Sequence, residues 1–130
     1  MARTILLIDD DADEYLIFQD ALELINLKTK LHWLSSAEQL HEYLRELTPD
    51  IIFVDLNMPK IYGLTCVRWL KNQQQTKNIP VVIYSTTITE VDKTIARSLG
   101  VFDTMEKASD MQSLASRLEK LFAALANKAD

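Results

Sequence analysis

Four short apolar runs, separated by longer amphipathic segments, constrain the fold more than any other feature of this sequence. They are "ILLI", "LHWL", "IIFV" and "VVIY", at residues 5–8, 31–34, 51–54 and 81–84. Runs of this length that are rich in Ile and Val are typical of strands buried on both faces. A weaker fifth run, "VFDTM", covers residues 101–105. We therefore expect four buried strands and a fifth with a less regular pattern.

The segments between these runs carry apolar residues three or four positions apart, which is the spacing of one face of a helix. Ser36 and Ser109 are expected N-caps, and Gly100 is placed to end the helix before it. The predicted helices cover residues 12–25, 36–47, 63–73, 89–99 and 109–127.

Strand and helix thus alternate five times along the chain. This alternation predicts an α/β fold with a doubly wound, five-stranded parallel sheet and helices on both of its faces. The common strand order for such a flavodoxin-like sheet is 2-1-3-4-5. Ligands of this architecture bind outside the carboxyl ends of the strands, where strands 1 and 3 lie side by side.

The composition limits the kind of protein. The 130 residues are expected to form one domain, residues 1–130, and the net charge of −5 disfavours a nucleic-acid or membrane-surface role. The apolar runs are too short for a signal peptide or for the roughly 18 residues of a membrane helix. The single cysteine, Cys66, cannot form an internal disulfide and is expected in the helical core. A cytoplasmic protein is the expectation.

Acidic and polar residues follow the predicted strands at their carboxyl ends. Asp9 and Asp10 follow the first strand, Asp55 the third, Ser85 the fourth, and Lys107 comes just after the fifth. Two carboxylates about 4 Å apart repel by roughly 4 kcal/mol at an effective dielectric constant near 20. Three of them together need protonation or a cation, and an all-oxygen cluster suits Mg²⁺.

A carboxylate at such a site can act as a nucleophile. Asp55 ends a buried apolar run, where a charge is costly unless another group offsets it. A carboxylate can attack phosphorus and form an aspartyl phosphate. The metal and Lys107 would then neutralise the oxygens of the transferring group, which is most of the catalysis that phosphoryl transfer requires.

Over essentially its whole length the chain resembles the receiver domain of two-component response regulators, of the single-domain, stand-alone type. The matching segments are "ILLIDDDAD", "IIFVDLNMPKIYGL", "IPVVIYSTT" and "LGVFDTMEK". The family spacing is present as well: Ser85 lies 30 residues after Asp55 (85 − 55) and Lys107 lies 52 after it (107 − 55).

The resemblance implies a role for each site residue. Asp55 matches the phosphoacceptor, which also contacts Mg²⁺. Asp10 matches a direct metal ligand, Asp9 a ligand through water, and the main-chain carbonyl of Asn57 the remaining protein ligand. Ser85 would be the switch hydroxyl, and Lys107 would bind the phosphoryl group.

The resemblance also implies partners. The phosphoryl donor would be a sensor histidine kinase or a histidine phosphotransfer protein, and the signal would pass by docking onto a downstream protein. The chain would catalyse only its own phosphorylation and dephosphorylation, so it would not be an enzyme in the usual sense.

Two alternatives remain open. A small Mg²⁺-dependent phosphatase of the haloacid-dehalogenase type also uses an Asp, a Ser or Thr and a Lys, but it needs a second acid where this chain has Asn57. A pseudo-receiver that acts only as an adaptor would lack some of the site residues, and all of them are present here. Incubation with Mg²⁺ and a small phosphodonor distinguishes these functions.

Four residues depart from the family pattern. Tyr62 replaces a common Asp, and Thr86 replaces a smaller residue after the switch Ser. Thr104 occupies the place of the usual switch aromatic, and Ala108 that of the usual Pro after the Lys. A cis peptide before Ala would cost roughly 2.5–4 kcal/mol, so we expect Lys107–Ala108 to be trans.

Several other residues are expected to be structural. Asp11, Asp13 and Glu14 are interpreted as charges that favour the start of the first helix through its dipole. The side chains of Trp33 and Trp69 are expected to pack rather than to bind ligands.

Overall fold

The apolar runs form strands and the amphipathic segments form helices, as the alternation predicts. The computed structural model describes residues 3–25, 28–108 and 110–128. The strands are β1 (Arg3–Ile8), β2 (Thr29–Leu34), β3 (Ile51–Val54), β4 (Val81–Ser85) and β5 (Asp103–Glu106). The helices are α1 (Ala12–Leu24), the 3₁₀ turn η1 (Ala37–Gln39), α2 (Leu40–Glu46), α3 (Gly63–Lys71), α4 (Glu90–Ser98) and α5 (Met111–Lys128).

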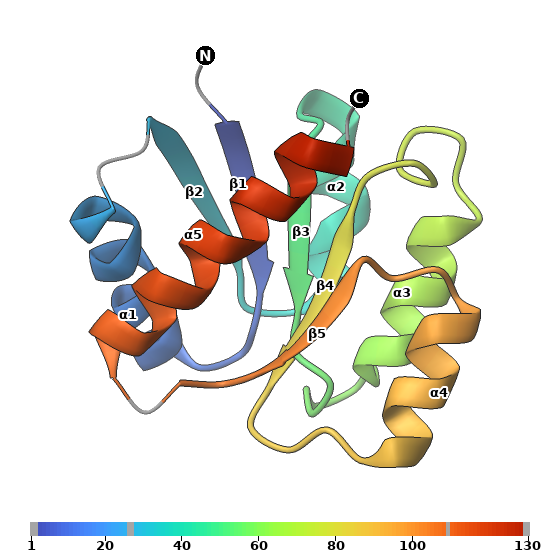
Figure 1. Ribbon diagram of the computed structural model, residues 1–130. Coiled ribbons are helices and arrows are strands. Elements are labelled where there is room, and N and C mark those ends of the chain that lie inside the picture. Colours follow the sequence, from blue (N-terminus) through green and yellow to red (C-terminus); the bar gives the residue numbers. More distant parts are fainter. Residues whose placement is uncertain (1–2, 26–27, 109, 129–130) are drawn as a thin grey trace.

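The strands form one parallel sheet in the order β2-β1-β3-β4-β5, which confirms the predicted fold class (Figure 1). The register aligns the carboxyl ends of the central strands. Ile8 of β1 pairs with Val54 of β3, and Val54 pairs with Ile83 of β4. The residues that follow β1 and β3 therefore emerge at the same edge of the sheet, at the bottom of Figure 1.

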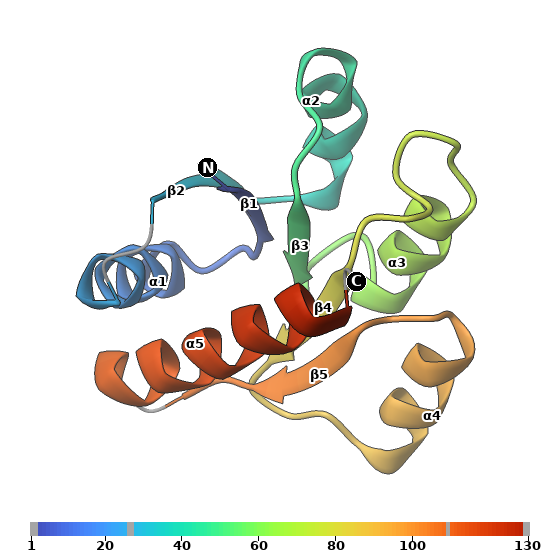
Figure 2. The ribbon, with the colours of Figure 1, turned by 45° about the horizontal axis from the view of Figure 1, so that its top comes forward.

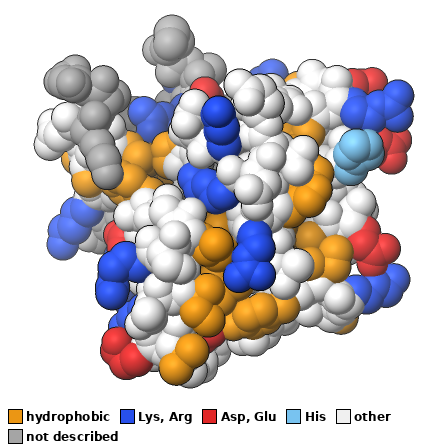
Figure 3. All heavy atoms as spheres, turned by 90° about the vertical axis from the view of Figure 1, so that its right-hand side faces the viewer, with side chains coloured by type: hydrophobic (Ala, Val, Ile, Leu, Met, Phe, Trp, Pro, Cys, Tyr) orange, Lys and Arg blue, Asp and Glu red, His pale blue; other side chains and the backbone are white. Residues whose placement is uncertain are grey.

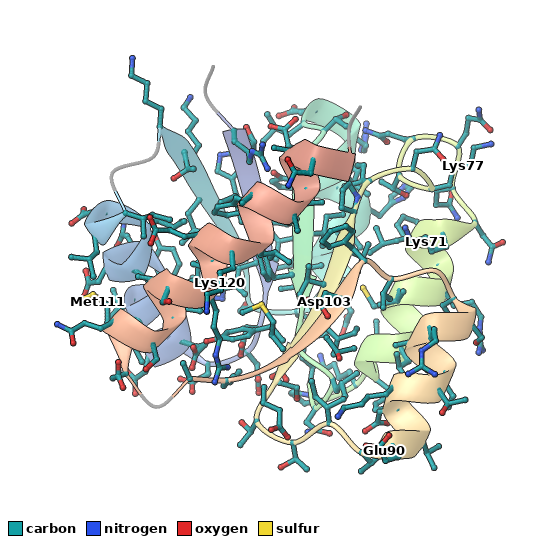
Figure 4. All side chains as sticks on the ribbon, in the orientation of Figure 1. Lys71, Lys77, Glu90, Asp103, Met111 and Lys120 are labelled. Carbon is teal, nitrogen blue, oxygen red and sulfur yellow. The ribbon has the colours of Figure 1, made fainter. Side chains whose placement is uncertain are left out.

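Two hydrophobic layers sandwich the sheet, because successive strand residues point to opposite faces. Ile5, Leu7 and Phe53 pack with residues of α1 and α5 on one face. Leu6, Ile8 and their neighbours pack with residues of α2, α3 and α4 on the other. Figures 1 and 2 both show α1 and α5 side by side, and Figure 4 shows side chains filling the space between helices and sheet.

Burial of the edge strand β2 differs from the prediction. All residues of β3 and β4 are buried, but β2 has none fully buried and Lys30 is exposed. The expectation that "LHWL" is buried on both faces is wrong, because β2 is an edge strand that pairs with β1 alone. The opposite edge strand, β5, begins at Asp103, and its Asp103 and Glu106 are exposed.

The helix ends follow local capping rules. Ser36 accepts a hydrogen bond from the Glu38 N–H, so it caps the 3₁₀ turn that precedes α2. Gly100, with φ of 81°, ends α4. The predicted cap Ser109 lies outside the described residues, and Asp110 accepts a hydrogen bond from the Ser113 N–H at 2.7 Å.

The side of the molecule that carries α3 and α4 exposes hydrophobic patches among Lys and Arg side chains (Figure 3). A groove of about 370 Å³ between α2 and α3 is lined by Leu40, Cys66 and Trp69, among others. Cys66 is buried, as predicted, and burial raises the pKa of its thiol to about 12. A thiol with so high a pKa is a poor nucleophile, which agrees with a packing role.

Candidate functional site

Residues that follow or end four of the strands meet at the carboxyl edge of the sheet. The Ser85 hydroxyl donates a hydrogen bond of 2.8 Å to Asp55 Oδ1. Lys107 Nζ lies 2.8 Å from Asp9 Oδ2 and 3.6 Å from Asp55 Oδ2. The structure therefore brings Asp9, Asp55, Ser85 and Lys107 into direct contact, although 98 residues (107 − 9) separate the first from the last.

Asp10 completes an acidic cluster at the same place. One carboxylate oxygen from each of Asp9, Asp10 and Asp55 can be chosen so that all three lie within 4.8 Å of one another. Asp9 and Asp55 are buried, whereas Asp10 is exposed. The ammonium of Lys107 supplies one positive charge against three carboxylates, so the cluster retains an excess of negative charge.

Asp9 lies in an environment that disfavours its ionised form, mainly because the side chain is buried. Burial raises the pKa of the Asp9 carboxyl from 3.8 to about 6, although the neighbouring Lys107 ammonium and the hydrogen bond from the Asp11 N–H act to lower it. Asp9 Oδ2 is buried and accepts no well-directed hydrogen bond among the described residues. Its 2.8 Å approach to Lys107 Nζ is short enough for an ion pair but is not aligned as a hydrogen bond.

These features fit a hard divalent cation. The donors are carboxylate oxygens, one of them buried without a directed hydrogen bond, and the cluster opens to solvent on the side of Asp10. Oxygen ligands of this kind suit Mg²⁺ or a similar ion, which retains several waters when it binds to proteins. The cluster is therefore a candidate metal centre.

Lys107 is held as a charged group. Burial lowers the pKa of Lys107, but the neighbouring Asp9 and Asp55 carboxylates outweigh this effect and raise it overall. The ammonium also lies 5.9 Å from the centre of the Tyr84 ring, within the range of a cation–π contact. A fixed cation here can neutralise an anionic group that binds to Asp55.

Gly63 allows α3 to start directly against the Asp55 backbone. The Gly63 N–H donates a hydrogen bond of 2.9 Å to the Leu56 carbonyl. A Cβ atom at position 63 would lie only 2.3 Å from the Asp55 carbonyl oxygen. Residue 63 must therefore lack a side chain for the end of β3 to keep its position.

The residues around Asp55 and Ser85 leave the site open. Asn57 is exposed, and its N–H lies 3.4 Å from Asp55 Oδ1. Thr86 and Thr87 are exposed beyond the end of β4. The predicted role of the Asn57 carbonyl as a metal ligand stays a prediction.

The residues that depart from the family pattern make contacts of their own. The Tyr62 hydroxyl donates a 2.5 Å hydrogen bond to Asp92, which belongs to the capping box of α4. Thr104 lines a hollow of about 170 Å³ together with Lys93 and Arg97 of α4. Lys107–Ala108 is trans, as predicted, since no described peptide bond is cis.

Two contacts beside the site were not predicted. Glu14 is buried, and its carboxylate accepts a 2.5 Å hydrogen bond from Tyr84, so its role is not limited to the helix dipole. The Trp33 indole donates a 2.7 Å hydrogen bond to the main-chain carbonyl of Asp9, so it does more than pack. Buried Tyr and Trp need polar partners, which is a usable signal, but the sequence does not identify those partners.

Comparison with known proteins agrees with this geometry. A profile of the response regulator receiver domain matches residues 5–119. The chain belongs to this family. Receiver domains of this family typically bind a divalent metal, and the acidic cluster of Asp9, Asp10 and Asp55 is consistent with such a site.

Curated relatives of this receiver domain include the polar-differentiation response regulator DivK of Brucella ovis. It is 29% identical over 82 residues, which cover 63% of this chain and 65% of DivK. The match to these relatives thus spans slightly less than two thirds of their length.

Solved structures match the receiver over most of its length. The phosphorylated cyanobacterial phytochrome response regulator RcpA has a TM-score of 0.83 at 26% identity, covering 93% of this chain and 91% of its own. The Mn²⁺-bound response regulator Rcp1 has a TM-score of 0.80 at 24% identity, covering 92% of this chain and 91% of Rcp1. Chemotaxis protein CheY4 of Vibrio cholerae has a TM-score of 0.80 at 18% identity, covering 92% of this chain and 98% of CheY4. The last two likenesses bear on the fold alone.

No helix among the described residues of the receiver is both long and apolar enough to span a membrane.

Proposed function

We propose that this receiver accepts a phosphoryl group on Asp55 in a Mg²⁺-dependent reaction. The observation that carries the proposal is the set of contacts made by the Asp55 carboxylate. Its Oδ1 accepts a hydrogen bond from Ser85, its Oδ2 lies 3.6 Å from Lys107 Nζ, and the carboxylate contributes one oxygen to the three-carboxylate cluster. A buried carboxylate placed between a hydroxyl, an ammonium and a metal centre is equipped for nucleophilic attack on phosphorus.

The donor is a phosphohistidine of a sensor histidine kinase or of a histidine phosphotransfer protein. An Asp55 oxygen forms the new O–P bond while the P–N bond to the donor imidazole breaks, and the imidazole leaves with the electron pair of that bond. When bound, Mg²⁺ would supply positive charge to the phosphoryl oxygens. Asp10, Asp55 and the Asn57 carbonyl would hold it directly, and Asp9 through water.

Lys107 and Ser85 then act on the product. Lys107 pairs with Asp55 before the reaction and contacts a phosphoryl oxygen after it, so its charge stays neutralised throughout. The Ser85 hydroxyl, which donates a hydrogen bond to Asp55 Oδ1 in this structure, can turn to donate a hydrogen bond to a phosphoryl oxygen instead. This movement at the end of β4 is the start of the conformational signal.

We propose that the signal reaches a downstream protein by docking, in the cytoplasm. Thr104 is too small to fill the space that an aromatic ring occupies in other receivers. The change is therefore carried mainly by the loop at residues 85–90 and by Lys107. In this proposal the chain catalyses only its own phosphorylation and dephosphorylation.

Incubation with Mg²⁺ and acetyl phosphate tests the proposed function against its alternatives. A receiver forms a stable aspartyl adduct, a small phosphatase turns over a phosphate ester such as p-nitrophenyl phosphate, and an adaptor does neither. Asn57 stands where the phosphatase needs its second acid. The wild-type protein, which lacks that acid, should therefore still form the adduct. Continuous ester hydrolysis by the unmodified protein would contradict the proposal.

A further inference from the structure

An aromatic pair on β2 and α1 contacts the loop that carries Asp9 and Asp10, two of the three residues of the acidic cluster. The Trp33 indole N–H donates a 2.7 Å hydrogen bond to the main-chain carbonyl of Asp9. The Trp33 ring stacks on Tyr15, with ring centroids 5.0 Å apart and planes inclined by 11°. Asp9 has no exposed surface, so its carbonyl depends on a protein donor.

The remaining polar groups of Asp9 are held as well. Its N–H donates to the Leu34 carbonyl at 3.0 Å, and its Oδ1 accepts from the Asp11 N–H at 3.0 Å. Its Oδ2 lies 2.8 Å from Lys107 Nζ. The carbonyl therefore completes a set of contacts that fixes the whole residue, and Trp33 supplies that last contact from the edge strand.

The Asp9 carbonyl belongs to the peptide group that joins Asp9 to Asp10. The orientation of this planar group determines where the backbone of Asp10 lies, because only two soft dihedral angles separate successive peptide planes. Asp10 is exposed, in contrast to the other two carboxylates of the cluster. A hydrogen bond that fixes the peptide before Asp10 thus limits the positions open to that carboxylate.

We propose that Trp33 is a positioning residue for the divalent cation, holding the Asp9–Asp10 peptide so that Asp10 is preorganised to bind the ion. The inference rests on the proposed metal site and assigns part of its affinity to a side chain that never touches the metal. Without the indole donor, metal binding must also order this peptide, and the cost appears as weaker affinity. We expect an affinity about three- to tenfold lower, in line with the net contribution of one hydrogen bond.

The test compares two conservative substitutions of the two tryptophans. Trp33→Phe keeps an aromatic ring beside Tyr15 but removes the N–H donor. Trp69→Phe is the matched control, because Trp69 lines the groove between α2 and α3. Isothermal titration with Mg²⁺ should show wild-type affinity for Trp69→Phe and a three- to tenfold loss for Trp33→Phe, with circular dichroism confirming that both are folded.

A second measurement applies even if Trp33→Phe fails to fold. Trp69→Phe leaves Trp33 as the single tryptophan, since the chain has two. We expect its indole N–H resonance to exchange slowly with solvent and to shift on Mg²⁺ addition. Equal Mg²⁺ affinity of wild type and folded Trp33→Phe, or an indole resonance that does not shift when Mg²⁺ is added, would overturn the inference about Trp33 and leave the proposed metal site intact. A wild-type protein that binds no Mg²⁺ would overturn the proposed metal site together with it.

Discussion

Replacing Gly63 by Ala should disturb the site through its backbone. The added Cβ would lie 2.3 Å from the Asp55 carbonyl oxygen and 2.7 Å from Leu56 Cα. Both atoms belong to the main chain, so no flexible side chain can move aside. The start of α3 and the end of β3 must separate, and Asp55 moves with the latter.

The expected magnitude follows from this geometry. Overpacking of a well-packed site costs typically about 1–3 kcal/mol. Unfolding in urea has a slope of about 1–3 kcal/mol per molar for small proteins, so the urea midpoint should fall by about 1 M. Mg²⁺ affinity should also fall, because the displaced backbone carries Asp55.

The other glycine of the chain provides the control. Gly100 has φ of 81° but no atom within 4 Å of an added Cβ, so Gly100→Ala adds backbone strain without a clash. Strain in this region costs about 1–2 kcal/mol. Urea unfolding and Mg²⁺ titration of both variants separate the effects: both should lose stability, and Gly63→Ala alone should lose metal affinity. Wild-type midpoint and affinity in Gly63→Ala would refute the reasoning.

Three further predictions concern the charges and the water access of the site. Lys107→Ala should still bind Mg²⁺ but be phosphorylated more slowly, because the lysine contacts phosphoryl oxygens rather than the metal; loss of Mg²⁺ binding in the folded variant would disprove this role. Thr87→Glu should change the dephosphorylation rate of the adduct, since an acid at this exposed position can orient the hydrolytic water; an unchanged decay would show that access is controlled elsewhere. The pKa of Asp9 is raised by burial to about 6, so the folded state binds this proton more tightly than the unfolded chain. Metal-free stability should therefore fall as pH rises from about 4 to about 6, by on the order of 2–3 kcal/mol. Urea midpoints measured across this range check the slope, which Asp9→Asn should abolish.

The order of the elements could be predicted because it follows from local patterns. Short Ile- and Val-rich runs alternating with helical spacing allow few topologies, and the parallel order β2-β1-β3-β4-β5 is among the commonest. The topology in turn places Asp9, Asp55, Ser85 and Lys107 at one edge. The apolar pattern of β2 overestimates its burial, whereas the predicted strand order already places this strand at the edge of the sheet with a single neighbour.

The contacts around the site were harder to predict because they join distant segments through single atoms. The hydrogen bond between Tyr84 and Glu14 spans 70 positions, and that between Trp33 and the Asp9 carbonyl spans 24. Both donor groups belong to large aromatic side chains, which the sequence predicts only to pack in the core. Residue type indicated that a polar partner was needed, but the partner depends on the side-chain geometry of neighbouring elements.

Mass spectrometry of the phosphorylated protein tests the central claim most directly. Wild type and Asp55→Asn are incubated with acetyl phosphate, with Mg²⁺ and with excess chelator, and the intact mass and the modified peptide are determined. The account predicts one added phosphoryl group in wild type with Mg²⁺, located on Asp55, and none in Asp55→Asn or in the chelated sample. Equal labelling of wild type and Asp55→Asn, or labelling that persists without a divalent cation, would contradict it.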